Sequence, residues 1–161
     1  MAVENLSGTI RGVDATYGVG EGGTLKSKTV TVEVSANASA TSTYFQGKLR
    51  IPSTARIVGG ISKIYLDDLA SSGSPTLDAG LFAVNGNITS DDDALNDGID
   101  AASAGSVSLI KDISNYGKKA YEFVSGQTSD PQGELDVVLT IKDAATNTGG
   151  TVTMELFYTI D

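Results

Sequence analysis

Residues 133–161, GELDVVLTIKDAATNTGGTVTMELFYTID, carry the most regular hydropathy pattern in the chain. Apolar residues recur at every second position in two segments, 135–141 and 152–160, which is typical of strands with one buried face. The run Asn147-Thr148-Gly149-Gly150 lies between the segments and favours a turn. The pattern predicts a β-hairpin whose core side carries Leu135, Val137, Leu139, Ile141, Val152, Met154, Leu156, Tyr158 and Ile160.

Upstream segments extend this pattern over the rest of the chain. Strands are expected at 29–34, 44–51, 55–66, 76–84, 107–113 and 121–124, and Asn85-Gly86 is a strong turn signal. Ser90 is a good helix cap, so the acidic stretch 91–96 predicts one short helix, ended by Gly98. Residues 1–25 have scattered apolar residues and end in a glycine-rich run, which favours an extended N-terminal arm. The expected fold is therefore all-β: an antiparallel, jelly-roll-like β-sandwich of about seven to nine strands over residues 26–161, behind that arm.

The composition excludes several classes of enzyme. The 161 residues include no Cys, no His and no Trp. A Ser-His-Asp or Cys-His nucleophile pair is therefore impossible, as are the ordinary zinc and iron–sulfur sites. Paired carboxylates such as Asp67-Asp68 lack the tryptophan platforms that usually accompany glycoside hydrolysis. We expect a protein that is not an enzyme and needs no cofactor.

The charge is strongly acidic and unevenly distributed. A net charge of −9 argues against a nucleic-acid partner and against an anionic membrane surface. The N-terminus has no basic and apolar regions of the kind that make a secretion signal, so none is expected. Residues 26–63 carry six Lys and Arg against Glu33 alone, whereas residues 64–110 carry eight Asp and no base. Such blocks are usually solvated faces, but in a self-assembling chain they could pair between subunits.

Two motifs have the spacing of known ligand sites. Gly18-Val19-Gly20-Glu21-Gly22-Gly23 has the spacing of a dinucleotide loop, but a strand pattern follows it where a helix is needed. The run 91–98, DDDALNDG, offers carboxylates for calcium, with Asp91, Asp93 and Asp97 as the candidate ligands. It is not an EF-hand, because Leu95 occupies a ligand position and no Glu closes the loop. A solvated acidic segment is the preferred interpretation.

Four stretches resemble small virion structural proteins of tailed bacteriophages, especially those of cyanophages and marine phages. They are TYFQGKLRIPSTAR (43–56), SPTLDAGLFAV (74–84), DDDALNDGIDAA (91–102) and the segment 133–161. The resemblance covers about residues 40–161. It implies a capsid decoration (cement) protein, a class that typically binds as a homotrimer and clamps neighbouring major capsid subunits on the outer surface of the virion. Such a protein would be made in the host cytoplasm.

The resemblance leaves the contact residues open, so these come from charge and position. We expect the arm and the basic segment 48–63 to contact the capsid, through Leu6, Ile10, Arg11, Val13, Lys48, Arg50, Arg56 and Lys63. The acidic stretch 85–103 would then face outward or toward a neighbouring subunit. Two alternatives remain: a virion-associated or extracellular binding module that recognises glycans or depends on calcium, and a tail or neck component.

Overall fold

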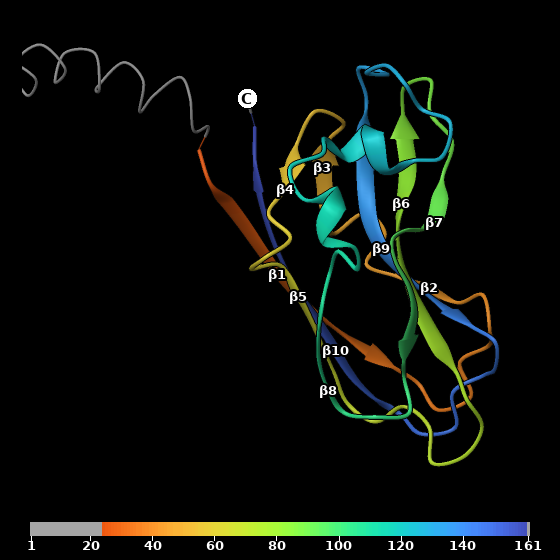
Figure 1. Ribbon diagram of the computed structural model, residues 1–161. Helices are drawn as coiled ribbons and strands as arrows, with labels where there is room; N and C mark the ends of the chain where they lie inside the picture. The colour runs from red at the N-terminus through yellow and green to blue at the C-terminus, as the bar shows by residue number, and fades with distance from the viewer. Residues whose placement is uncertain (1–23, 161) are drawn as a thin grey trace, which may run out of the picture.

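The structure is a computed structural model that describes residues 24–160. Its strands form two five-stranded antiparallel sheets that pack against each other (Figure 1). Sheet A has the order β1-β10-β5-β8, with β4 also paired to β10, and contains β1 (Lys26–Val34), β4 (Arg56–Ile57), β5 (Lys63–Leu66), β8 (Gly105–Ser108) and β10 (Gly150–Thr159). Sheet B has the order β2-β9-β6-β7, with β3 also paired to β9, and contains β2 (Thr43–Tyr44), β3 (Arg50–Pro52), β6 (Thr76–Asn85), β7 (Asp91–Asp100) and β9 (Glu134–Lys142). The expected all-β antiparallel sandwich is confirmed.

The core lies between the two sheets and is built from every second residue of the long strands. On β9 and β10 the inward residues are Leu135, Val137, Leu139, Ile141, Val152, Met154, Leu156 and Tyr158, all of them buried. Burying one such side chain stabilises the fold by about 1.5–3 kcal/mol, which fixes the face that each strand turns inward. The alternation in residues 133–161 is therefore confirmed as two strands with one core face each.

The predicted hairpin between these two strands is wrong. β9 pairs with β6, β2 and β3 in sheet B, whereas β10 pairs with β1, β5 and β4 in sheet A. The linker 143–149 crosses from one sheet to the other instead of turning back within one. The register of β10 with β1 runs without a break over nine residue pairs, from Lys26–Tyr158 to Val34–Gly150. The alternating pattern identified the strands but held no information on which strands pair.

The predicted helix at 91–96 is also wrong, because these residues belong to β7. The Ser90 hydroxyl that was expected to cap a helix accepts instead from the Ala83 backbone N–H at 3.0 Å, which ties β7 to β6. Leu95 and Ile99 of β7 are buried in the core, and this burial outweighs the helix signal of the aspartates. The β6–β7 register shifts twice, so the acidic residues bulge away from a regular ladder.

Three other segments differ from expectation in detail. Residues 55–66 form two short strands, β4 and β5, on either side of a turn at Gly59-Gly60. The strand expected at 107–113 ends at Ser108, since Leu109 and Ile110 are both buried and break the alternation. The strand expected at 121–124 is a 3-10 helix, η2 (Ala120–Phe123), which follows a second one, η1 (Ile113–Asn115).

The strand orders give the sandwich two lateral sides. On one side β1 lies next to β3, where the Lys28 Nζ donates to the Arg50 carbonyl at 2.5 Å. On the other side β7 lies next to β8, where the Asn96 side-chain amide donates to the Ser108 carbonyl at 2.8 Å. We name them the β1 side and the β7 side. No helix within residues 24–160 is long and apolar enough to span a membrane.

Candidate functional site

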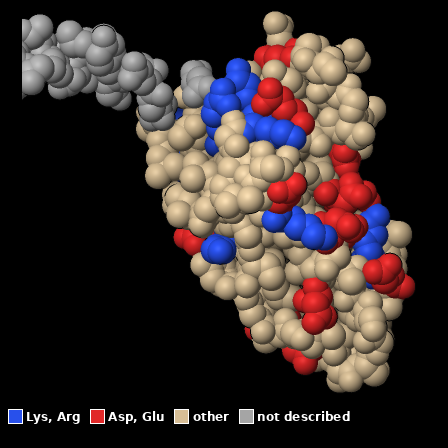
Figure 2. Space-filling view, in the orientation of Figure 1, with Lys and Arg blue, Asp and Glu red and all other residues tan. Residues whose placement is uncertain are grey.

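The acidic segment that was considered for calcium lies on the β7 side. Carboxylate oxygens of Asp91, Asp92 and Asp93 all lie within 4.8 Å of one another, whereas Asp97 is not part of this group. Side chains of Asp and Glu gather along the flank formed by β7 (Figure 2). Two of the three predicted ligands, Asp91 and Asp93, are thus together, and Asp92 is a neighbour that the prediction left out.

These carboxylates already have partners within the chain. The Lys142 Nζ lies 2.5 Å from Asp92 Oδ2, and the Ser125 backbone N–H donates to Asp91 at 3.0 Å. Asp97 pairs with Lys111 at 3.8 Å. The pKa of Asp93 is raised by two effects: the larger is the hydrogen bond that it shares with Asp91, and the smaller is its partial burial. Lys142 thus already supplies positive charge to this group, which favours the interpretation as a partly neutralised acidic surface over a cation site.

The residues expected to contact a capsid do not form one patch. Leu6, Ile10, Arg11 and Val13 lie outside the described residues. Lys48 precedes β3 and is exposed, whereas Arg56 on β4 and Lys63 on β5 belong to sheet A. Arg50, on β3, belongs to sheet B. The basic block of the sequence is therefore divided between the two sheets.

Arg50 has a structural partner that sequence analysis missed. Its Nε and Nη2 donate to the two carboxylate oxygens of Asp136 at 3.0 and 3.3 Å, and this bidentate pair raises the pKa of Arg50. Asp136 is only 2% exposed and also accepts from the Gly47 backbone N–H at 2.9 Å. The pair pins the segment before β3 to the outer face of sheet B. Strand alternation placed Asp136 on the polar face of β9, but nothing in the sequence linked it to Arg50.

A basic cluster that the sequence analysis did not single out lies at one end of sheet A. Arg56 pairs by register with Thr159 at the end of β10, and an isolated bridge joins it to Lys119. The Arg56 guanidinium also donates to the Gly117 carbonyl. Lys118 lies 5.9 Å from the centre of the Phe123 ring, and Lys and Arg gather beside β4 and η2 (Figure 2). We name Arg56, Lys118 and Lys119 the basic end. In the sequence, the signal for this cluster was the pair of adjacent lysines at 118 and 119.

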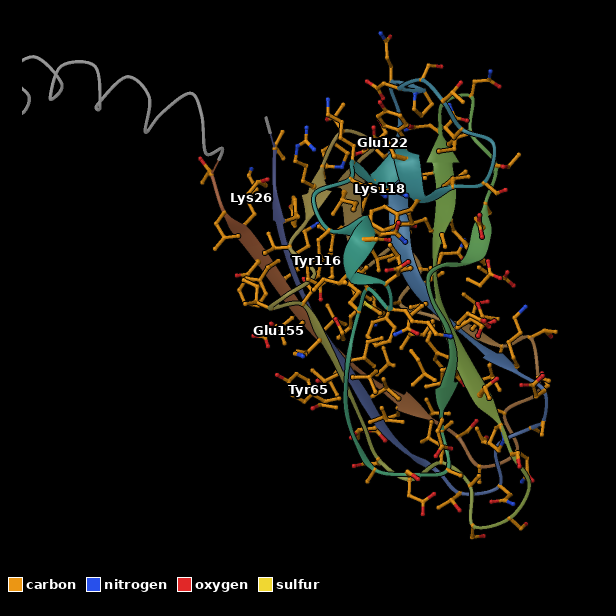
Figure 3. The ribbon with its side chains drawn as sticks, viewed as in Figure 1. Lys26, Tyr65, Tyr116, Lys118, Glu122 and Glu155 are labelled. Carbon is orange, nitrogen blue, oxygen red and sulfur yellow. The ribbon has the colours of Figure 1, made fainter. Side chains whose placement is uncertain are left out.

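The outer face of sheet A is polar and carries both signs of charge, through Glu33, Glu155 and Lys63. Its exposed residues on β1 are Ser27, Thr29, Thr31 and Glu33, opposite Phe157, Glu155, Thr153 and Thr151 of β10. Tyr65 of β5 is 43% exposed, and its hydroxyl donates to Glu155 at 3.3 Å (Figure 3). Ile61, in the turn before β5, is 45% exposed. This face offers aromatic and aliphatic surface among small hydroxyl groups, a composition suited to contact with another protein.

A shallow hollow lies between two loops, lined by Gly86, Asn87, Ile88, Thr89, Ser125, Gly126 and Gln127. Its lining is mostly polar and holds no charged side chain. Every buried polar side-chain atom in the described part of the chain has a hydrogen-bond partner. No unsatisfied group therefore points into this hollow to mark a buried ligand site.

Comparison with known proteins gives a match at the level of the fold. No family model matches the chain, and no curated protein matches it. A chain in the capsid of Ralstonia phage GP4 has a TM-score of 0.59 and 18% identity, over 89% of each chain. A chain in the capsid asymmetric unit of cyanophage Pam1 has a TM-score of 0.56 and 15% identity, over 88% of this chain and 89% of that one. The fold is thus one that occurs in chains of phage capsids.

Proposed function

We propose that the chain is a non-enzymatic structural protein of a bacteriophage virion, and specifically a decoration (cement) protein that bridges major capsid subunits on the outside of the head. The observation that carries this proposal is the fold shared, over nearly the whole of both chains, with chains in two phage capsids. The lack of His and Cys agrees with a role performed by surfaces.

The outer face of sheet A and the basic end are the surfaces best suited to contact the shell. They adjoin each other, since Arg56 of the basic end pairs with Thr159 of β10. Together they combine exposed apolar groups, small hydroxyl groups and the positive charges of Lys63, Lys118 and Lys119. Residue 24, where the N-terminal arm joins the body, also lies next to this end, because Lys26 pairs with Tyr158.

The arm is the second part of the proposed shell contact, through Leu6, Ile10, Arg11 and Val13. A body face and an arm that bind two neighbouring capsid subunits would bridge them. Because such a protein binds the assembled shell and not separate subunits, it would stabilise the shell by mass action. In this arrangement the acidic β7 side faces away from the shell or toward another copy, and three copies form a homotrimer.

Binding to heads tests this proposal. Purified protein is mixed with expanded heads that lack it and is sedimented, and the temperature at which the heads release DNA is measured. We expect saturable binding and a higher release temperature. Lys118→Ser and Lys63→Ser should each weaken binding, whereas the matched control Lys111→Ser, on the β7 side, should not. If the wild-type protein does not bind heads, the proposed function is wrong.

A further inference from the structure

Among the outermost strands of the two sheets, and within residues 24–160, β1 has the longest regular edge without a partner. It is nine residues long, contains no proline, and keeps an unbroken register with β10 on its other edge. The outermost strands β8 and β2 have four and two residues, and β7 is irregular and rich in aspartate. Short, bulged and charged edges resist the addition of another chain, whereas a long regular edge accepts it. Within residues 24–160, the backbone groups on the outer edge of β1 have no strand partner and are available to another chain.

The β1 side also has apolar surface that the chain leaves partly uncovered. Val30 and Val32 of β1 face the core but are only half-buried, and so is Tyr44 of β2. Partial burial raises the pKa of Tyr44. These three side chains, beside the free strand edge, would lose water contact if another surface covered the β1 side.

The two lateral sides carry opposite charge. On the β1 side, β1 carries Lys26, Lys28, whose Nζ donates to the Arg50 carbonyl, and the acidic Glu33. The exposed Lys48 lies in the loop between β2 and β3, the strands at this edge of sheet B. The β7 side presents Asp91, Asp93, Asp97 and Asp100, with Lys111 and the Lys142 that pairs with Asp92 as its cations. Part of the basic segment 26–63 and part of the acidic segment 64–110 thus lie on opposite sides of the sandwich, whereas Arg56 on β4 and Lys63 on β5 lie on neither side. A second copy of this chain supplies the acidic surface that matches the β1 side.

We propose that the β1 side of one copy binds the β7 side of a second copy, head to tail. Lys26, Lys28 and Lys48 then face the β7 aspartates, and the open edge of β1 is covered. Because the two contacting surfaces differ, the contact does not end in a two-fold dimer. It closes into a ring where the rotation between copies allows it and otherwise continues as a filament, and we propose the ring. The number of copies in the ring, three, rests on the proposed function. The contact itself does not, because it is formed between copies of this chain alone.

Light scattering with size-exclusion chromatography tests the contact on the full chain without heads. Wild-type protein should form a closed oligomer that dissociates as salt is raised, because exposed charges are screened. The double variant Lys26→Glu/Lys48→Glu should be monomeric, with association weakened about a hundredfold or more by like charges across the contact. Asp93→Lys/Asp97→Lys should be monomeric for the same reason. Each variant's melting temperature shows whether it is folded.

Mixing the two double variants is the decisive measurement. Each has two sides of the same sign and repels itself, but a contact between unlike variants again joins opposite charges. A ring of three would keep one contact between like copies, so the expected product is a heterodimer or a larger species in which the two variants alternate. Association of the two variants in an equal mixture supports the contact. The matched control Lys111→Glu makes the same chemical change on the β7 side, and it should leave assembly intact or strengthen it.

Four results would overturn the inference. They are a monomeric wild-type protein, double variants that assemble like wild type, no recovery on mixing, and loss of assembly from the β1-side variant alone. The last result would indicate symmetric β1–β1 pairing. Failure here is separable from failure of the proposed function: a monomer that still binds heads contradicts only the contact, and an oligomer that does not bind heads contradicts only the function.

Discussion

Sheets A and B are built from the same alternating pattern but have opposite outer faces. Sheet B buries polar groups on its outer face, including Asp136, Thr140 and Asp78. These groups lie under the segment before β3 and the acidic segment of β7, which they hold in place. The outer face of sheet A is covered by neither segment and buries no charged residue within the described chain. One sheet uses its outer face to fix its own loops, and the other keeps that face available for a partner.

The largest expected effect comes from removing the buried carboxylate of sheet B. Asp136→Ala leaves the Arg50 guanidinium and the Gly47 N–H without their acceptor. We expect a loss of about 2–3 kcal/mol in the free energy of unfolding, measured by urea denaturation. Arg50→Ala should cost about as much, because it leaves the buried Asp136 carboxylate without its counter-charge, whereas the more exposed Arg50 can be hydrated when Asp136 is removed. A far smaller loss for Arg50→Ala would show that the Gly47 N–H and water satisfy Asp136 without Arg50.

A second difference between the sheets is the room for a side chain at a strand glycine, Gly80 in sheet B and Gly105 in sheet A. A Cβ on Gly80 of sheet B would lie 2.3 Å from the Asp91 carbonyl oxygen, so Gly80→Ala must displace the acidic segment. We expect it to cost about 1–3 kcal/mol, measured by thermal unfolding. Gly105→Ala on sheet A is the matched control, since a Cβ there meets nothing within 4 Å. A neutral Gly80→Ala would show that the acidic segment does not pack against β6.

A smaller and pH-dependent effect is expected at Asp78. Burial raises its pKa above the ordinary 3.8, although the Gly98 N–H donates to it. Its charge therefore costs stability at neutral pH, and this cost disappears as the pH falls through the raised pKa. Asp78→Asn should stabilise the protein near pH 7, with a gain that shrinks toward pH 4. Melting temperatures at both pH values check this, and a gain independent of pH would contradict it.

The smallest effect on stability is expected on the outer face of sheet A. Ile61→Ser and Tyr65→Ser remove exposed side chains, so each should change the free energy of unfolding by less than about 0.5 kcal/mol. If this face contacts the shell, the double variant should nevertheless bind heads more weakly in sedimentation. Unchanged binding would move the proposed contact away from this face.

The sequence predicted strands better than it predicted their partners. Alternation located β1, β6, β9 and β10, because burial of every second residue leaves a local signal. It could not show that β9 and β10 belong to different sheets, since both have the same pattern. The helix signal at Ser90 and the aspartates was real locally, but the buried Leu95 and Ile99 outweighed it. The uneven charge of the surface could be predicted from the sequence, because the basic and acidic residues are grouped along the chain. The pairing of Arg50 with Asp136 could not, because it depends on tertiary structure.

The pairing of β1 with β10 has a mechanical consequence. The described chain begins at residue 24, just before β1, and β1 runs antiparallel to β10 over nine pairs. A pull on residue 24 along the axis of β1, with sheet A held fixed, loads those pairs in shear, all at the same time. A pull across the sheet would instead peel them apart one by one. The β1–β10 pairing therefore resists a pull along the strands more strongly than a pull across the sheet.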